Sequence, residues 1–232
     1  MEIKESQPLT AVWQKWRFSA PQTHLWLIKH WFSASTFMVK IATFAKPQNV
    51  TSNCKKTTMT PKQTEKLKKQ IADIKRTLAS EKRKYGAYDD SRGMRYYPPK
   101  VYLKLQDFQG GLTYTKWFQK NFSDDSGFPD FLFEWTIILF KTDNFKNAEK
   151  KAFETFCSNT YLFDKFFGRP VVQIDKYEYS NIDIPAFTDS LEYSSDQPEL
   201  ADFSKWLTNY IATEKFIILS TKFIDLNKKL KT

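Results

Sequence analysis

Apolar residues recur at helical spacing over much of the chain that follows Thr60. In the first such segment they come at intervals of four, three and four residues, with lysines and arginines between them: Leu67, Ile71, Ile74 and Leu78. This spacing places the apolar side chains on one face of a helix. The start has an N-cap, a first-position proline and a capping-box partner in Thr60, Pro61 and Gln63. The pattern predicts an amphipathic helix over residues 60–84.

Further helices are expected towards the C-terminus. Pro129 opens a helix over residues 131–141, and a second helix follows over residues 146–156. A short apolar helix at 161–167 ends at Gly168, and two more stretches keep helical spacing, at 200–210 and 216–226. The chain contains only six glycines, too few for a turn-dense sandwich or barrel. The predicted fold class is therefore all-α.

The central part of the chain repeats itself at an offset of 37 residues. Residues 102–111 (YLKLQDFQGG) align with residues 139–148 (LFKTDNFKNA), and both contain an apolar pair, a lysine, a polar turn and an aromatic. A small residue follows three positions after each aromatic. We expect Phe108 and Phe145 to fill the gap between two antiparallel helices, while Gly111 and Ala148 let the backbones approach closely. The pattern predicts a helix-hairpin array.

These residues resemble the tetratricopeptide repeat (TPR). The sequence NFSDD at 121–125 is similar to that family's loop between repeats, and the insertion at 126–128 accounts for a spacing above the usual value of about 34 residues. Pro98 and Pro99 depart from the family, which has a Leu-Gly pair there, so the first helix is expected to be shortened or to start at the prolines. The resemblance covers residues 98–158. It implies stacked helix hairpins with a concave surface that binds peptides.

The resemblance implies a non-enzymatic protein-interaction module, or adaptor, whose partner is a protein or peptide. The first helix of each TPR hairpin lines the binding groove, which gives one set of expected partner-binding residues: Phe133, Ile137, Phe140, Lys104 and Lys141. A place in the hydrophobic core is the alternative for the three apolar side chains. If either aromatic wedge, at 108 or 145, pointed into water, the adaptor interpretation would lose its basis.

Charge divides the chain into two parts. Residues 1–96 contain 19 Lys and Arg against 7 Asp and Glu, a net charge of +12, whereas residues 97–232 contain 17 against 19, a net charge of −2. Affinity for polyanions is therefore expected only in the first part. The alternative function is nucleic-acid or anionic-surface binding by the basic helix 60–84, through Lys68, Lys69, Lys75, Arg76, Lys82 and Arg83. A simply solvated basic face is the competing interpretation.

Residues 1–58 have a character of their own, distinct from the helical domain expected over residues 59–232. No acidic residue occurs from Ser6 to Thr64, and four of the seven tryptophans lie there. The segment fits an organellar transit peptide, an interfacial amphipathic arm or a poorly structured basic extension, of which we prefer the last. Lys29, His30 and Lys40 interrupt the apolar residues after position 25, so no transmembrane helix is predicted. The expected location is cytoplasmic.

Catalytic and cofactor-binding motifs do not occur in the sequence. A nucleophile elbow, a Walker loop and a dinucleotide fingerprint are all missing, and the two Cys and two His residues lack metal-ligand spacing. No enzyme activity, cofactor or metal is therefore expected. A weaker alternative is a hydrolase that uses Asp89 and Asp90 with Arg92, although a capping and ion-pairing role would also place these residues in a turn.

Overall fold

Helices form most of the regular structure in the computed structural model, which describes residues 59–88, 90 and 92–231. Within these residues there is no strand, as the all-α prediction requires. Expectations for residues 1–58 and for Asp89 lie outside the described residues. The α-helices are α3 (Pro61–Tyr85), α4 (Pro98–Leu105), α5 (Phe108–Asn121), α6 (Pro129–Lys141), α7 (Phe145–Ser158), α8 (Leu162–Phe166), α9 (Ala201–Ile211) and α10 (Glu214–Lys231). The same described residues also form the short 3-10 helices η3 (Met94–Tyr96), η4 (Pro185–Ser190) and η5 (Pro198–Leu200).

Local signals set the boundaries of several helices. At the start of α3 the Gln63 amide donates to the Thr60 hydroxyl at 3.3 Å, and the Thr60 amide donates to the Gln63 side chain at 2.8 Å. This reciprocal pair confirms the predicted capping box. Proline also stands at the first position of α4 and of α6. Gly86, with φ of 75°, ends α3 in the left-handed conformation that glycine adopts without strain.

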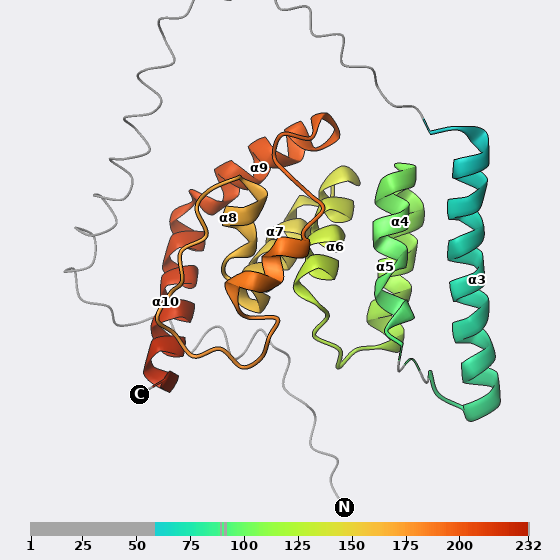
Figure 1. The fold of residues 1–232 in the computed structure, drawn as a ribbon, viewed down its shortest axis with the longest axis horizontal. Coiled ribbons are helices and arrows are strands. Elements are labelled where there is room, and N and C mark those ends of the chain that lie inside the picture. Colours follow the sequence, from blue (N-terminus) through green and yellow to red (C-terminus); the bar gives the residue numbers. More distant parts are fainter. Residues whose placement is uncertain (1–58, 89, 91, 232) are drawn as a thin grey trace, which may run out of the picture. The chain divides into compact units, whose positions relative to one another are not determined.

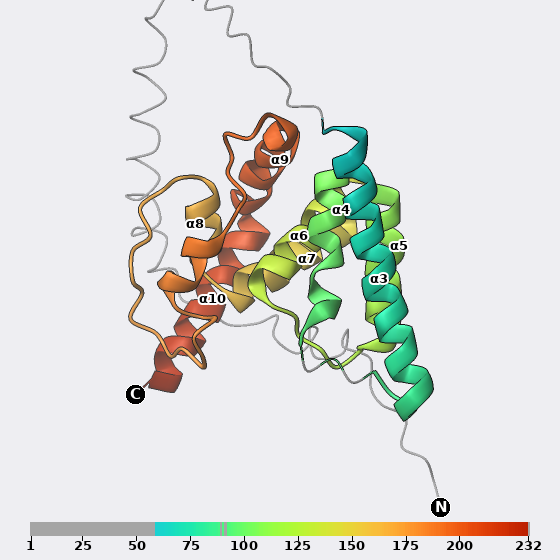
Figure 2. The same ribbon diagram turned by 45° about the vertical axis from the view of Figure 1, so that its right-hand side comes forward.

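Successive helices pack as neighbours. α4 lies against α5 and α6 against α7, while α4 and α5 both also contact α6. α3 packs along α4, and Figures 1 and 2 show it at the opposite side of the domain from α10. After α7 the chain forms α8, α9 and α10, which contact α7, α6 and α7 respectively. The order along the chain is thus close to the order in space.

Two hydrophobic clusters meet at α6. Phe131, Leu132 and Trp135 face the cluster formed with α3, α4 and α5. Phe133 and Ile137 face the other cluster, formed with α7, α8, α9 and α10. A helix that is apolar on all sides must be covered on all sides. The C-terminal elements therefore bury the face of α6 that an open helix-hairpin array would leave exposed.

The two expected aromatic wedges differ from each other. Phe108 is half-buried, but Phe145 is 45% exposed, and its ring lies 5.7 Å from that of Phe140 between centroids. The wedge expectation is therefore wrong for Phe145. Phe145 is the first residue of α7, as Phe108 is of α5, so the place at the helix start does not by itself bury the ring.

The small residues behave as the sequence predicts. A Cβ atom on Gly111 would lie 2.9 Å from Cδ1 of Ile138 and 3.3 Å from Cβ of Tyr102. Ala148, its counterpart in α7, has no exposed surface. Glycine at position 111 therefore lets α5 approach α4 and α6 more closely than any larger residue would.

Candidate binding pocket

A pocket of about 190 Å³ opens where α4 ends, α5 begins and α6 ends, beside residues 192–200. Its wall combines charged, aromatic and aliphatic side chains, among them Lys104, Phe108, Lys141, Glu192, Tyr193 and Leu200. Pockets for cofactors and drug-sized ligands usually measure about 300 to 1,000 Å³. This pocket is smaller, and its size suits one side chain of a peptide.

The turn between α4 and α5 places Lys104 and Phe108 at the same rim. α4 ends at Gln106, which has φ of 54°, and the Asp107 amide donates to the Tyr102 carbonyl at 3.0 Å. The Asp107 carboxylate then caps α5 by accepting from the Gly110 amide at 2.9 Å. A short link thus brings the last turn of α4 next to the first residue of α5.

Lys141 ties the segment 192–200 to α6. Its Nζ donates to the Glu199 carbonyl at 2.7 Å and to Oδ1 of Asp202 at 2.5 Å. The same ammonium lies 5.9 Å from the centre of the Phe108 ring, within the range of a weak cation–π contact. Because Lys141 already has two oxygen partners, its main effect is to fix the wall of the pocket.

Lys104 has a looser environment. Its Nζ lies 3.2 Å from Oε2 of Glu192, and about half of each side chain is exposed. Lys100 donates to the other oxygen of Glu192 at 2.6 Å, and this hydrogen bond lowers the pKa of Glu192. An exposed ion pair contributes on the order of 0 to 1 kcal/mol, so an incoming acid can compete for Lys104 at little cost.

A buried carboxyl group lies beneath the pocket. Glu134, in the middle of α6, is 3% exposed, and its Oε1 accepts from the Tyr193 hydroxyl at 2.8 Å. Burial raises the pKa of Glu134 well above its usual value, and the hydrogen bond from Tyr193 opposes this only in part. The nearby charge of Asp130 raises the pKa further, whereas that of Lys100 lowers it. Burial and Glu134 together also raise the pKa of Tyr193.

The expected partner-binding residues fall into two groups. Lys104 and Lys141 meet at the pocket, although they come from different helices. Phe133 and Ile137 have no exposed surface, and Phe140 is partly buried against Phe203 at 5.5 Å. The three apolar residues therefore belong to the core, and Phe133 and Ile137 cannot touch a partner while the C-terminal elements cover α6.

Other residues of the pocket were not expected from the sequence. Glu192 and Tyr193 lie in a stretch without helical spacing, 84 and 85 residues after Phe108 along the chain. Phe108, which was expected to be a wedge, also lines the opening. Nothing local in the sequence links these residues to Lys104.

The basic residues of α3 differ in what they contact. Lys75 donates to the Tyr102 hydroxyl at 2.9 Å, and Lys82 lies 4.6 Å from the centre of the Tyr88 ring, so both interact with the neighbouring part of the domain. Short-range ion pairs within the helix join Lys68 to Glu65 and Arg76 to Asp73, at 3.7 and 2.9 Å. Lys69 and Arg83 are exposed to solvent.

Asp90, the described member of the suggested carboxylate pair, is engaged in the turn before η3. Its carboxylate accepts from the amides of Met94 and Arg95, both at 2.8 Å, and pairs with the Arg95 guanidinium at 3.2 Å. Arg95 also pairs with Asp125 at 2.8 Å. The Asp90 side chain is 2% exposed and thus acts as a cap and ion-pair partner, which leaves no oxygen open to a substrate.

The described residues contain neither a cluster of metal ligands nor a helix that could span a membrane. Between residues 59 and 231 no group of three His, Cys, Asp or Glu side chains is placed to hold a metal ion. Among the helices of the same residues, none is long and apolar enough to cross a membrane.

Comparisons with known proteins give no match. No protein-family model matches this chain, no curated protein matches its sequence, and no solved structure matches its fold.

Proposed function

We propose that this chain is a non-enzymatic protein-interaction module that binds a peptide segment of a partner at the pocket beside Lys104. In this proposal the pairs α4–α5 and α6–α7 are TPR-like hairpins, and the module acts in the cytoplasm. The exposure of Phe145 removes the argument for an adaptor that was based on the two aromatic wedges, so the proposal rests on the pocket instead. Its main support is the meeting of Lys104, Lys141, Phe108 and Tyr193 at one small opening.

The chemistry of the pocket suggests how a peptide would bind. One apolar side chain enters beside Phe108, Tyr193 and Leu200, where it loses contact with water. An acidic residue next to it replaces Glu192 as the partner of Lys104, while Lys100 keeps Glu192 in place. The wall is fixed in advance by Lys141, so little ordering is needed on binding.

The test is a peptide-display selection against the full chain, followed by affinity measurements on the enriched peptides. We expect enriched peptides to share an apolar residue next to an acidic one. Lys104→Glu should weaken them about tenfold, equal to about 1.4 kcal/mol. Phe108→Ala should weaken them as well.

Lys150→Glu, an exposed charge reversal on α7, is the matched control and should bind as the unaltered chain does. The proposal fails if no such motif is enriched, or if the enriched peptides bind Lys104→Glu and Phe108→Ala with undiminished affinity.

A second candidate is nucleic-acid binding through the outer face of α3. α3 contains nine Lys and Arg against three Asp and Glu, a net charge of +6, and its buried residues Ile71 and Leu78 lie on one face. We expect phosphate contacts by Lys69 and Arg83 to make the affinity for duplex DNA or RNA fall steeply as salt rises. This candidate would be excluded if the affinity did not depend on salt concentration, or if Lys69→Glu/Arg83→Glu bound nucleic acid as the unaltered chain does.

A further inference from the structure

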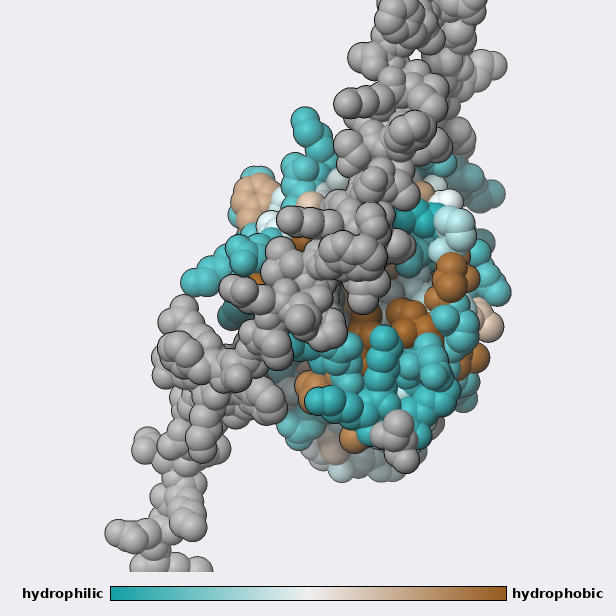
Figure 3. Space-filling view, turned by 90° about the vertical axis from the view of Figure 1, so that its left-hand side faces the viewer, coloured by the Kyte–Doolittle hydropathy of each residue, from teal (hydrophilic) through white to brown (hydrophobic). Residues whose placement is uncertain are grey.

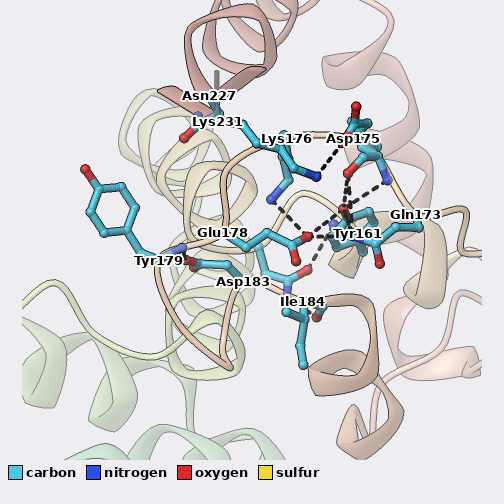
Figure 4. A network of polar contacts seen from close by, with 12 residues as sticks. Tyr161, Gln173, Asp175, Lys176, Glu178, Tyr179, Asp183, Ile184, Asn227 and Lys231 are labelled. Atoms are coloured by element: carbon cyan, nitrogen blue, oxygen red, sulfur yellow. Dashed lines mark hydrogen bonds and ion pairs between the residues drawn. The ribbon is translucent and has the colours of Figure 1, made fainter. Parts of the chain in front are cut away.

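A loop without regular secondary structure, residues 170–184, is held in place by side chains that are largely buried. We call it the strap. The Tyr161 hydroxyl accepts from the Ile174 amide at 3.1 Å and donates to Oε1 of Glu178 at 2.9 Å. Gln173 donates to the same oxygen at 2.9 Å, and Figure 4 shows these groups converging. The strap is therefore fixed to the start of α8.

A buried lysine strengthens this attachment. The Lys176 side chain is only 4% exposed, and its Nζ lies 3.5 Å from Oε1 of Glu178. The same ammonium lies 5.2 Å from the centre of the Tyr161 ring. A buried charge is stable only when it is paired, so Lys176 and Glu178 hold each other in the strap.

The strap is also fixed to the last turns of α10. The Tyr177 amide donates to the Asn227 carbonyl at 2.9 Å, and Lys231 pairs with Asp175. Asp183 accepts from the Tyr179 amide at 2.8 Å and so closes the turn that follows. These contacts place two tyrosines beside the end of α10.

Apolar and aromatic side chains are exposed on the strap and on the last turns of α10. Tyr179 is 74% exposed and Tyr177 39%, their rings meet edge to face at 4.7 Å, and Figure 4 shows Tyr179 pointing away from the polar network. Leu226 and Leu230, one turn apart on α10, are 48% and 59% exposed. Figure 3 shows apolar residues among hydrophilic ones on the face that carries α10. Exposed apolar side chains on a helix and on a loop that is fixed to it are typical of an interaction site.

Positive charge surrounds these side chains. The last ten residues of α10 contain the exposed lysines Lys222, Lys228, Lys229 and Lys231. Asp225 is the one acid in that stretch. In the strap, Asp175 and Glu178 are paired with lysines, and Asp183 accepts from the amides of Tyr179 and Ser180. The surface thus combines tyrosine, leucine and lysine.

We propose that this surface, made of Tyr177, Tyr179, Leu226, Leu230 and the lysines of the last turns of α10, docks on an anionic lipid bilayer. Tyrosine is enriched at membrane interfaces because its ring is apolar and its hydroxyl polar. Leucine side chains enter the boundary between headgroups and acyl chains, and lysines attract anionic headgroups. The exposed aliphatic side chains favour lipid over single-stranded nucleic acid, whose bases stack on aromatic rings.

The test is flotation of the full chain with phosphatidylcholine vesicles, with and without about one quarter phosphatidylserine. We expect association with the anionic vesicles only, and a decrease as salt rises. Tyr179→Ser/Leu230→Ser and Lys222→Glu/Lys228→Glu should each reduce the bound fraction at least about fivefold. The altered side chains are exposed, so the fold should persist, and circular dichroism checks this.

Tyr85→Ser/Lys205→Glu, which removes one exposed tyrosine and reverses one exposed lysine elsewhere, is the matched control and should float as the unaltered chain does. Equal flotation of the strap and α10 variants would overturn the proposal, because the association would then come from another part of the chain. Absence of flotation with anionic vesicles would overturn it too, as would equal flotation with phosphatidylcholine alone.

Discussion

Glu134 has a carboxyl group in the core of the domain with one hydrogen-bond donor, the Tyr193 hydroxyl. Burial penalises its charged form, which is why the pKa of Glu134 is raised well above 4.5. The neutral acid is therefore favoured in the folded chain, whereas the unfolded chain ionises this group in the ordinary range. The residue links the stability of the domain to pH.

We predict that Glu134→Gln removes a loss of stability that the unaltered chain undergoes as pH rises. Above a pH of about 4.5 the folded state retains a proton that the unfolded state has released, so the free energy of unfolding falls by up to about 1.4 kcal/mol per pH unit until pH passes the folded pKa. Glutamine stays neutral and still accepts from Tyr193. Urea unfolding at a series of pH values measures the difference.

Glu214→Gln, an exposed change on α10, controls for the loss of one acid and should retain the pH dependence of the unaltered chain. If Glu134→Gln and the unaltered chain lost stability in parallel above pH 4.5, Glu134 would not be the linked group.

At the residue level the sequence predicts some of the pocket and misses the rest. Lys104 and Lys141 could be named because both occupy the same place in a repeated pattern. Glu192 and Tyr193 could not, because their partners Lys104 and Glu134 are distant in sequence and only the fold brings them together. A lone Glu or Tyr in a polar stretch gives no local signal of this kind.

At the level of elements, α6 determines how the two hydrophobic clusters are joined. Its residues alternate between the α3–α5 side and the α8–α10 side, so both of its faces are internal. The first residue of α7, by contrast, lies at the edge of the packing, as the exposure of Phe145 indicates. Replacing a buried phenylalanine of α6, such as Phe133, should therefore reduce the free energy of unfolding much more than replacing Phe145.

We predict that Phe133→Ala lowers the free energy of unfolding by about 3 to 5 kcal/mol, because it leaves a cavity among Phe163, Phe166 and Phe203. Phe145→Ala should lower it by about 1 kcal/mol or less, because nearly half of that side chain is already in water. Chemical denaturation of the two variants measures both free energies of unfolding. Equal losses would mean that Phe145 fills the hairpin after all.

Helix boundaries were more predictable than helix faces. α3, α4 and α6 begin at prolines, and α3 ends at a glycine, so the residues themselves mark these ends. One face of α6 is covered by α9 and lies near residues 192–200, which follow much later in the chain. Amphipathic spacing cannot reveal this, because α6 is apolar on all sides.

At the scale of the described domain, non-regular segments have specific positions because side chains hold them. Residues 192–200 are tied to α4 and α6 through Lys100, Lys104 and Lys141, and the strap is tied to the start of α8 through Tyr161 and to α10 through Lys231. Sequence patterns assign such stretches to loops and give no information on where they lie. The pocket and the strap surface both depend on these attachments.

The most direct test of the account is to map where a selected peptide binds, by amide chemical-shift changes in the isotope-labelled chain. The account predicts that the largest changes cluster at residues 103–108 and 192–200, around the pocket, and that Lys104→Glu needs about ten times more peptide to reach them. Changes centred on α3 or on any other surface, with the pocket unaffected, would contradict it.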